Sequence, residues 1–214
     1  ATRVDFLTGY QDAGYAARYK AFVGRVQAAE SKLGTSTPLT EAVAKYLFKL
    51  MAYKDEYEVA RLHTDPAFLA KIDAMFEGEY SLNYHLAPPL TAKRNDKGEL
   101  VKKKYGPGML RNFRLLARLK GLRGTPLDVF GRTQERRTER ALIAQYRDSI
   151  EEVLQTLGSG NHAQALEIAR IPEQIKGYGH VKERHLQAAR ARWAELMTAY
   201  RATVPPADAK RLLA

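Results

Sequence analysis

The sequence contains no cysteine among its 214 residues. Disulfide bonds, thiolate-held zinc and cysteine-held iron–sulfur clusters are therefore excluded within it. Hydrophobic residues make up 45% of the chain. Even so, no apolar run approaches the roughly 18 residues that a membrane-spanning helix needs. We expect no membrane segment and, because a chain without cysteine suits a reducing compartment, a cytoplasmic protein.

Motifs for common kinds of catalysis are also absent. The sequence has no G-x-S-x-G nucleophile elbow, no P-loop and no Ser/His/Asp arrangement. His180, Glu183 and His185 are close enough in sequence to offer a pair of metal ligands. Two ligands on one exposed helix face do not make a site, so we predict no metal here.

Three acidic residues lie close together at Asp55, Glu56 and Glu58. Such a group can serve as acid–base material, but Lys54 and Arg61 lie beside it. We interpret these residues as an ion-paired helix face.

Hydrophobic residues recur at steps of three and four along most of the chain, which is the period of an amphipathic helix. Start signals such as Thr37-Pro38 and Asp65-Pro66 mark helix N-termini. The predicted helices cover approximately residues 4–33, 38–62, 66–77, 107–120, 133–157, a short stretch after 161, and 180–202. The predicted core contains Phe22, Val26, Val43, Leu47, Leu50, Phe113, Leu116, Leu142, Tyr146, Ile150, Leu154, Leu186, Trp193 and Leu196.

The helical period is interrupted between about Tyr80 and Tyr105, where apolar and polar residues alternate around the turn residues Asn95–Gly98. We predict one β-hairpin, which must lie against helices or a neighbouring domain because an isolated hairpin is only marginally stable. The fold class is therefore mainly α, a multi-helix bundle with one inserted β-hairpin. We expect a single helical domain over residues 1–203 and a loose C-terminal tail over 204–214.

Positive charge is concentrated in one part of the chain. The net charge is +11, and the segment from Lys93 to Arg140 holds 15 basic and 5 acidic residues. We predict an anion- or partner-binding surface, the basic face, formed by Lys102, Lys103, Lys104, Arg111, Arg114, Arg118, Arg132, Arg136 and Arg140. A solvated surface, an acidic protein partner and nucleic acid remain open, although no recognised nucleic-acid motif accompanies these residues.

A second candidate lies where two glycines lead into the last helix. Gly177, Gly179, His180 and Lys182 could form an anion site at a helix N-terminus. The segment lacks the strand and the third glycine of a dinucleotide fingerprint. A tight turn between helices is therefore the favoured interpretation.

Five strings carry a family resemblance that extends from about Val4 to about Tyr200. In order they are FLTGYQDAGYAARYKAFV, EAVAKYLFKLMAYKDEYEVARL, YSLNYHLAPPL, YGPGMLRNFRLLARLKGLRGTPLDVFGRTQERRTERALI and IPEQIKGYGHVKE. Together they resemble the all-helical domain of unknown function at the C-terminal end of fused indolepyruvate ferredoxin oxidoreductases.

The resemblance implies a parent enzyme that oxidatively decarboxylates aryl pyruvates to acyl-CoA and passes the electrons to ferredoxin. Thiamine diphosphate, iron–sulfur clusters and coenzyme A would then be bound elsewhere in the parent chain, N-terminal to Ala1. This segment has neither the cysteines nor the Gly-Asp-Gly…Asn motif for them, so we expect no cofactor and no catalytic residue here.

The resemblance implies an accessory role in assembly or partner docking, with other domains of the parent oxidoreductase or ferredoxin as partners. Two alternatives stay open. One is a stand-alone basic module for nucleic acid or another polyanion, and the other is an independent enzyme with an unrecognised site.

Overall fold

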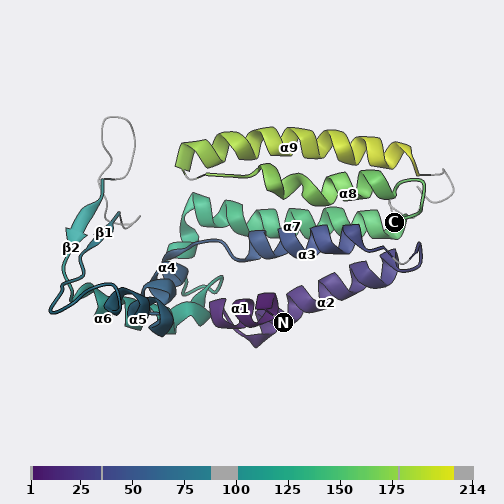
Figure 1. Ribbon diagram of the computed structural model, residues 1–214. Coiled ribbons are helices and arrows are strands. Elements are labelled where there is room, and N and C mark those ends of the chain that lie inside the picture. Colours follow the sequence, from purple (N-terminus) through teal and green to yellow (C-terminus); the bar gives the residue numbers. More distant parts are fainter. Residues whose placement is uncertain (1, 35, 88–100, 178, 205–214) are drawn as a thin grey trace. The chain divides into compact units, whose positions relative to one another are not determined.

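The computed structural model describes residues 2–34, 36–87, 101–177 and 179–204, and these are predominantly helical (Figure 1). The α-helices are α1 (Thr2–Tyr10), α2 (Ala13–Glu30), α3 (Pro38–Met51), α4 (Glu56–His63), α5 (Pro66–Asp73), α6 (Met109–Arg118), α7 (Gln134–Gln155), α8 (His162–Arg170) and α9 (Gly179–Ala202). Short 3₁₀ helices are η1 (Leu119–Leu122), η2 (Phe130–Arg132) and η3 (Ile171–Gln174). In the described ranges the strands are β1 (Tyr84–Leu86) and β2 (Lys103–Tyr105), which pair antiparallel. The mainly α fold with one inserted hairpin is confirmed.

The chain forms two compact units. The first, here called the helical unit, contains the described residues within Ala1–Thr8, Ala13–Ala52 and Thr138–Ala214. The second, the hairpin unit, comprises Gly9–Asp12 and Tyr53–Arg137. Our expectation of one domain over residues 1–203 with a tail over 204–214 stays a prediction. Val204 is buried, and residues 205–214 lie outside the described ranges.

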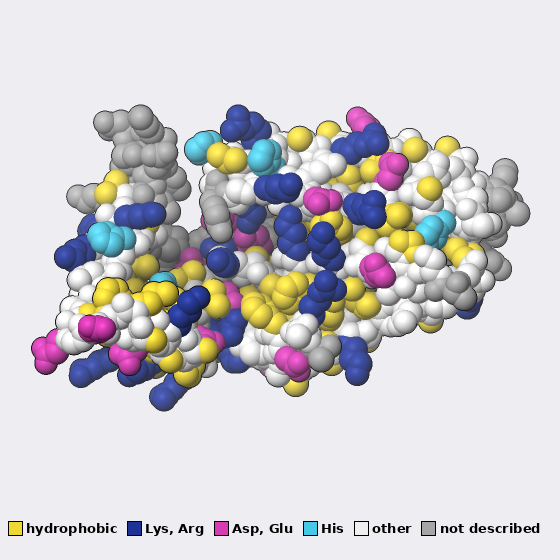
Figure 2. Space-filling view, viewed as in Figure 1, with side chains coloured by type: hydrophobic (Ala, Val, Ile, Leu, Met, Phe, Trp, Pro, Cys, Tyr) yellow, Lys and Arg dark blue, Asp and Glu magenta, His cyan; other side chains and the backbone are white. Residues whose placement is uncertain are grey.

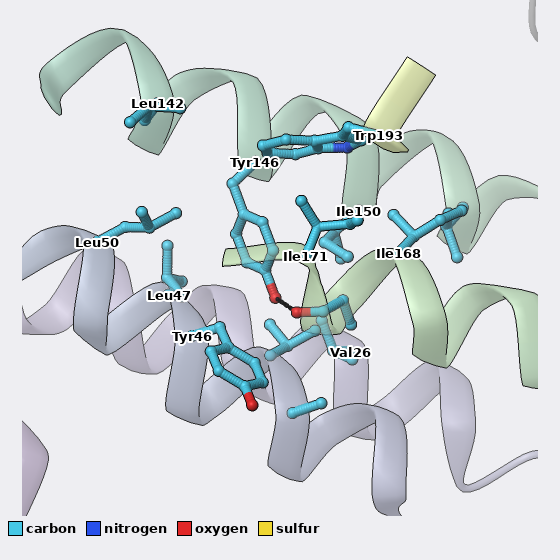
Figure 3. Close-up of a cluster of buried hydrophobic side chains, with 14 of the residues drawn as sticks. Val26, Tyr46, Leu47, Leu50, Leu142, Tyr146, Ile150, Ile168, Ile171 and Trp193 are labelled. Atoms are coloured by element: carbon cyan, nitrogen blue, oxygen red, sulfur yellow. Dashed lines mark hydrogen bonds between the residues drawn. The ribbon is translucent and has the colours of Figure 1, made fainter. Parts of the chain in front are cut away.

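The core of the helical unit is built from the apolar faces of α2, α3, α7, α8 and α9 (Figure 3). Tyr146 lies at its centre, packed edge-on against Trp193 with 6.0 Å between ring centroids. Its hydroxyl donates a hydrogen bond of 2.9 Å to the carbonyl oxygen of Ala169. Twelve of the predicted core residues are buried in the two units, whereas Leu116 and Leu154 are only half-buried.

Glu30, at the end of α2, is a buried carboxylate that caps the start of α3. One oxygen accepts from the Leu39 amide at 2.8 Å, and the other from the amide and hydroxyl of Thr40 at 2.7 Å each. His162 reaches the same carboxylate at 2.7 Å through Nε2. Thr37 occupies the predicted N-cap position, but its side chain makes no capping bond.

The hairpin unit has a smaller core around Ala60, Tyr84 and Phe113. The His63 ring stacks on Phe113 at 5.0 Å, and the Tyr84 ring meets both rings edge-on. Tyr84 pairs with Tyr105 across the hairpin. The hairpin therefore packs against α4 and α6, one of the two supports that the sequence prediction allowed.

Two predicted helices are each divided in the structure. The predicted helix over residues 4–33 is α1 and α2, separated at Gln11–Asp12, and Leu33 lies beyond the end of α2. The predicted helix over residues 38–62 is α3 and α4, because Asp55 adopts an extended conformation and accepts the Glu58 amide at 2.8 Å. The capping side chain of Asp55 thus starts a new helix, although the apolar period runs on through both α3 and α4.

Candidate partner-binding surface

Most buried charges in the hairpin unit are neutralised by neighbours. Arg123 is 4% exposed and makes two bonds to the carboxylate of Asp55, at 2.5 Å from Nε and 2.8 Å from Nη2. Its third nitrogen, Nη1, donates to the Tyr10 carbonyl at 2.6 Å, and the guanidinium lies 3.7 Å from the centroid of the Tyr10 ring. Because the hydrogen bonds of this buried ion pair are satisfied within the fold, we assign it a structural role.

A second buried group lies around Asp128. Its carboxylate accepts from the Gly124 amide at 2.8 Å, the Gly131 amide at 2.9 Å and the Tyr57 hydroxyl at 3.2 Å. Burial and the negative charge of Asp128 raise the pKa of Tyr57 to about 12. Tyr57 therefore stays protonated at neutral pH and acts as a hydrogen-bond donor.

The predicted acidic group at Asp55, Glu56 and Glu58 is ion-paired, but two of its partners lie farther along the sequence than we expected. Glu58 pairs with Arg61 through two bonds of 2.7 and 2.8 Å, as the sequence indicated. Asp55 pairs with Arg123, and Glu56 lies 3.5 Å from Nε of Arg136.

The exposed cations of α6 have no such neutralisation. Arg111, Arg114 and Arg118 are exposed, and within the described residues their side chains form no ion pair or hydrogen bond. At 3.6 residues per turn the three lie within about 60° of one another around the helix and span about 10 Å along it. Like charges spaced three and four apart repel by a few tenths of a kcal/mol per pair. We call these three residues the arginine row.

The lysines of the predicted basic face lie beside the hairpin. Lys102 precedes β2, and Lys103 and Lys104 lie within it. All three are exposed, and none is ion-paired to a residue in the described part of the chain. The hairpin unit thus carries six exposed cations from the predicted set whose side chains form no ion pair or hydrogen bond with the described residues.

The remaining three predicted residues have different surroundings. Arg132 is exposed and donates to the Pro126 carbonyl at 3.0 Å. Arg136 is half-buried beside Glu56, and its guanidinium lies 5.9 Å from the centroid of the Tyr53 ring. Arg140 is half-buried and belongs to the helical unit. We therefore limit the candidate surface to Lys102–Lys104 and the arginine row.

Exposed apolar side chains are concentrated in the same unit, and sequence reasoning missed this. Of the large hydrophobic residues that the described surface exposes, all but Leu33 belong to the hairpin unit. Leu115 is 61% exposed and Leu119 is 40% exposed, and both lie next to the arginine row. Figure 2 shows hydrophobic side chains beside Lys and Arg side chains where α5 and α6 are drawn in Figure 1. The sequence pattern that could have revealed these exposed leucines is the recurrence of Arg and Leu in α6 at steps of three and four.

At the predicted anion site, which lies at the start of α9, the backbone conformation explains why glycine is present. Gly177 has φ of +87°, and a β-carbon there would lie 2.9 Å from Cγ1 of Val181. Lys182 forms an ion pair with Glu139, and His180 is exposed. These observations favour a tight turn.

Two hollows in the described surface of the helical unit are open rather than deep. One, of about 610 Å³, lies along α7 and α9 and is lined in part by Ala141, Ala144, Trp193 and Arg201. The other, of about 440 Å³, lies beside Glu30 and His162. No group of three or more potential metal ligands occurs in the described ranges, and no helix there is long and apolar enough to cross a membrane.

Comparison with known proteins gives one match. Residues 1–195 match the family described as "Family of unknown function (DUF6537)". Neither the curated proteins nor the solved structures contain a match.

Proposed function

The chain belongs to the family of unknown function DUF6537, and from this premise we propose that it is a non-catalytic accessory domain that docks an acidic protein partner. We further propose that its parent is a fused indolepyruvate ferredoxin oxidoreductase, on the strength of the five sequence strings that resemble that family. Ferredoxin, commonly an acidic protein, is then the partner that fits best, and another domain of the parent chain is the second choice.

The observation that carries the docking role is the set of exposed cations in the hairpin unit that form no ion pair with any residue the structure describes. A protein gains nothing in stability from a row of like charges on one helix, since each pair is repulsive. An acidic partner would remove this repulsion and would be attracted over about one Debye length, roughly 10 Å at 0.1 M salt. Electrostatic attraction of this kind acts mainly on the association rate.

Chemistry by the segment itself is not part of the proposal. Iron–sulfur clusters need cysteine ligands, and the sequence has none. Thiamine diphosphate, the clusters and coenzyme A would be bound by other parts of the parent oxidoreductase. The purified segment should therefore show no visible absorbance from a cluster and no oxoacid-dependent dye reduction.

The parent assignment is tested first, by the full reading frame. It should continue upstream into a thiamine diphosphate domain and cysteine-rich domains. A frame that encodes neither would contradict the oxidoreductase assignment and would favour the alternative, a stand-alone basic module for a polyanion. That alternative predicts salt-dependent binding of DNA.

The docking role is tested in the full-length enzyme by changing Arg111, Arg114 and Arg118 together to Glu. We expect ferredoxin reduction at low salt to slow by at least about tenfold and to lose most of its salt dependence. Reduction of an uncharged artificial dye should be unchanged.

A charge-matched control changes Lys20, Arg184 and Arg190 to Glu, since these are exposed cations on helices of the other unit. If the arginine variant keeps wild-type ferredoxin kinetics and salt dependence while the enzyme stays assembled, the surface is merely solvated and the docking role is wrong.

A further inference from the structure

α6 exposes two parallel rows of side chains. Its inward face packs Phe113 against Tyr84 and includes the partly buried Leu116 and Ala117. Its outward face carries the arginine row and, about 90° further around the helix on average, Leu115 and Leu119. We call these two residues the leucine row. Leu119 directly follows the last residue of α6 and opens η1.

Neither residue of the leucine row belongs to the apolar core described for the hairpin unit. Leu115 is more exposed than the other large apolar residues of α6, and Leu119 is also exposed, whereas Phe113 on the same helix is 3% exposed. Exposed leucines scattered singly need no explanation. Two leucines one turn apart, beside three cations without ion pairs in the described chain, are a different arrangement, because apolar residues rimmed by charge are typical of binding sites.

The geometry points to a two-part docking site, in which the leucine row buries apolar surface of an acidic protein partner and the arginine row pairs with carboxylates around that surface. This inference rests on the proposed docking function and extends it by naming the chemistry of the partner. The partner must carry an apolar spot bordered by Asp or Glu. A purely acidic polymer such as DNA would satisfy the arginines and leave the leucines exposed.

The two rows have separable kinetic consequences. Charged residues steer encounter, so the arginine row acts on the association rate and on its dependence on salt. Apolar burial is short-ranged and insensitive to screening, so the leucine row acts on the dissociation rate. Binding should therefore persist at high salt with slower association.

The test measures binding of an oxidised acidic [4Fe–4S] ferredoxin to the full-length enzyme by stopped-flow, in two variants. Leu115→Gln with Leu119→Gln should raise the dissociation rate by about tenfold and leave the association rate and its salt dependence within about twofold. Arg111→Gln, Arg114→Gln and Arg118→Gln together should lower the association rate at low salt by about tenfold. Glutamine favours helix about as well as leucine and arginine, so α6 should be retained, and circular dichroism checks this.

Leu33→Gln is the control for an exposed leucine elsewhere, because Leu33 is as exposed as Leu119, at 40%, but belongs to the helical unit. It should bind like wild type. If the leucine variant also binds like wild type while the arginine variant is slowed, the two-part site is wrong and the docking function stands.

If neither variant changes ferredoxin binding, both proposals fail. If the leucine variant instead dissolves an oligomer of the enzyme, the leucine row joins copies of the chain, and the inference about an acidic partner is overturned.

Discussion

Replacing Asp55 with Asn should destabilise the hairpin unit severely, although the two side chains have nearly the same shape. The amide keeps an oxygen for the Glu58 backbone N–H, and Asn caps helices about as well as Asp. What is lost is the negative charge beside Arg123, whose side chain is 2% exposed. Removing one partner of a buried ion pair costs about 3–5 kcal/mol, because the other charge stays buried without compensation.

Asp65 provides the matched control, since it caps α5 in the same way but forms no ion pair within the described residues. It accepts the Ala67 amide at 2.8 Å and the Phe68 amide at 3.2 Å. Asp65→Asn should cost less than about 0.5 kcal/mol, because the cap survives. Urea unfolding followed by circular dichroism measures both variants, and thermal unfolding should place Asp55→Asn about 6–20 °C below wild type.

Removal of both charges sharpens this test. Asp55→Asn combined with Arg123→Met should recover part of the lost stability, because an apolar side chain replaces the unpaired cation. If Asp55→Asn is no more destabilising than Asp65→Asn, the buried ion pair does not contribute to the free energy of unfolding as we expect.

Three further predictions concern buried polar groups and backbone conformation. Burial raises the pKa of Glu30, but the hydrogen bonds it accepts lower that pKa by more, so the result lies below the ordinary 4.5. The contribution of Glu30 to the stability of the fold is therefore complete well above pH 4.5 and is lost as pH falls below that value. Glu30→Gln should cost about 1–3 kcal/mol at pH 7 and flatten the acid limb of the stability curve. Tyr57 ionises near pH 10 when unfolded and near 12 when folded, so its ionisation should cost wild type stability between these values; Tyr57→Phe should make the alkaline decline shallower, and an ultraviolet absorbance titration should show one late-titrating tyrosine fewer. Gly177→Ala should destabilise by more than Gly179→Ala in urea unfolding, since both have positive φ but only at Gly177 does a β-carbon meet a neighbour; equal costs would contradict the close approach of Val181.

Helix content and most of the core could be predicted because they depend on local period and capping residues. The break between α3 and α4 was missed because Tyr46, Leu50, Tyr53 and Tyr57 keep a helical period across it. The sequence Asp55-Glu56-Tyr57-Glu58 resembles a capping box and could have revealed the new start. An uninterrupted hydrophobic period therefore does not establish an uninterrupted helix.

The candidate surface was only partly predictable for a different reason. Sequence shows where cations are but not which of them find a counter-charge, and that depends on residues far away in the chain. Glu56 reaches Arg136 across 80 positions, so Arg136 could not be distinguished from Arg114 beforehand. Likewise, leucines at helical spacing are ordinarily assigned to a core, and only the structure reveals that Leu115 is exposed.

The path of the chain through the hairpin unit limits how this protein can be divided. The unit includes Gly9–Asp12, which is separated from the rest of it by forty residues of the helical unit. Those few residues supply the carbonyls that accept from Lys120 and Arg123 at 2.6 Å each, and also the Tyr10 ring. A gene fragment cut at Tyr53 and Arg137 would encode every strand and helix of the unit, yet its central arginine would lack a neighbour. The two units are therefore not interchangeable modules, because recombination at Tyr53 and Arg137 would transfer the hairpin unit without Gly9–Asp12.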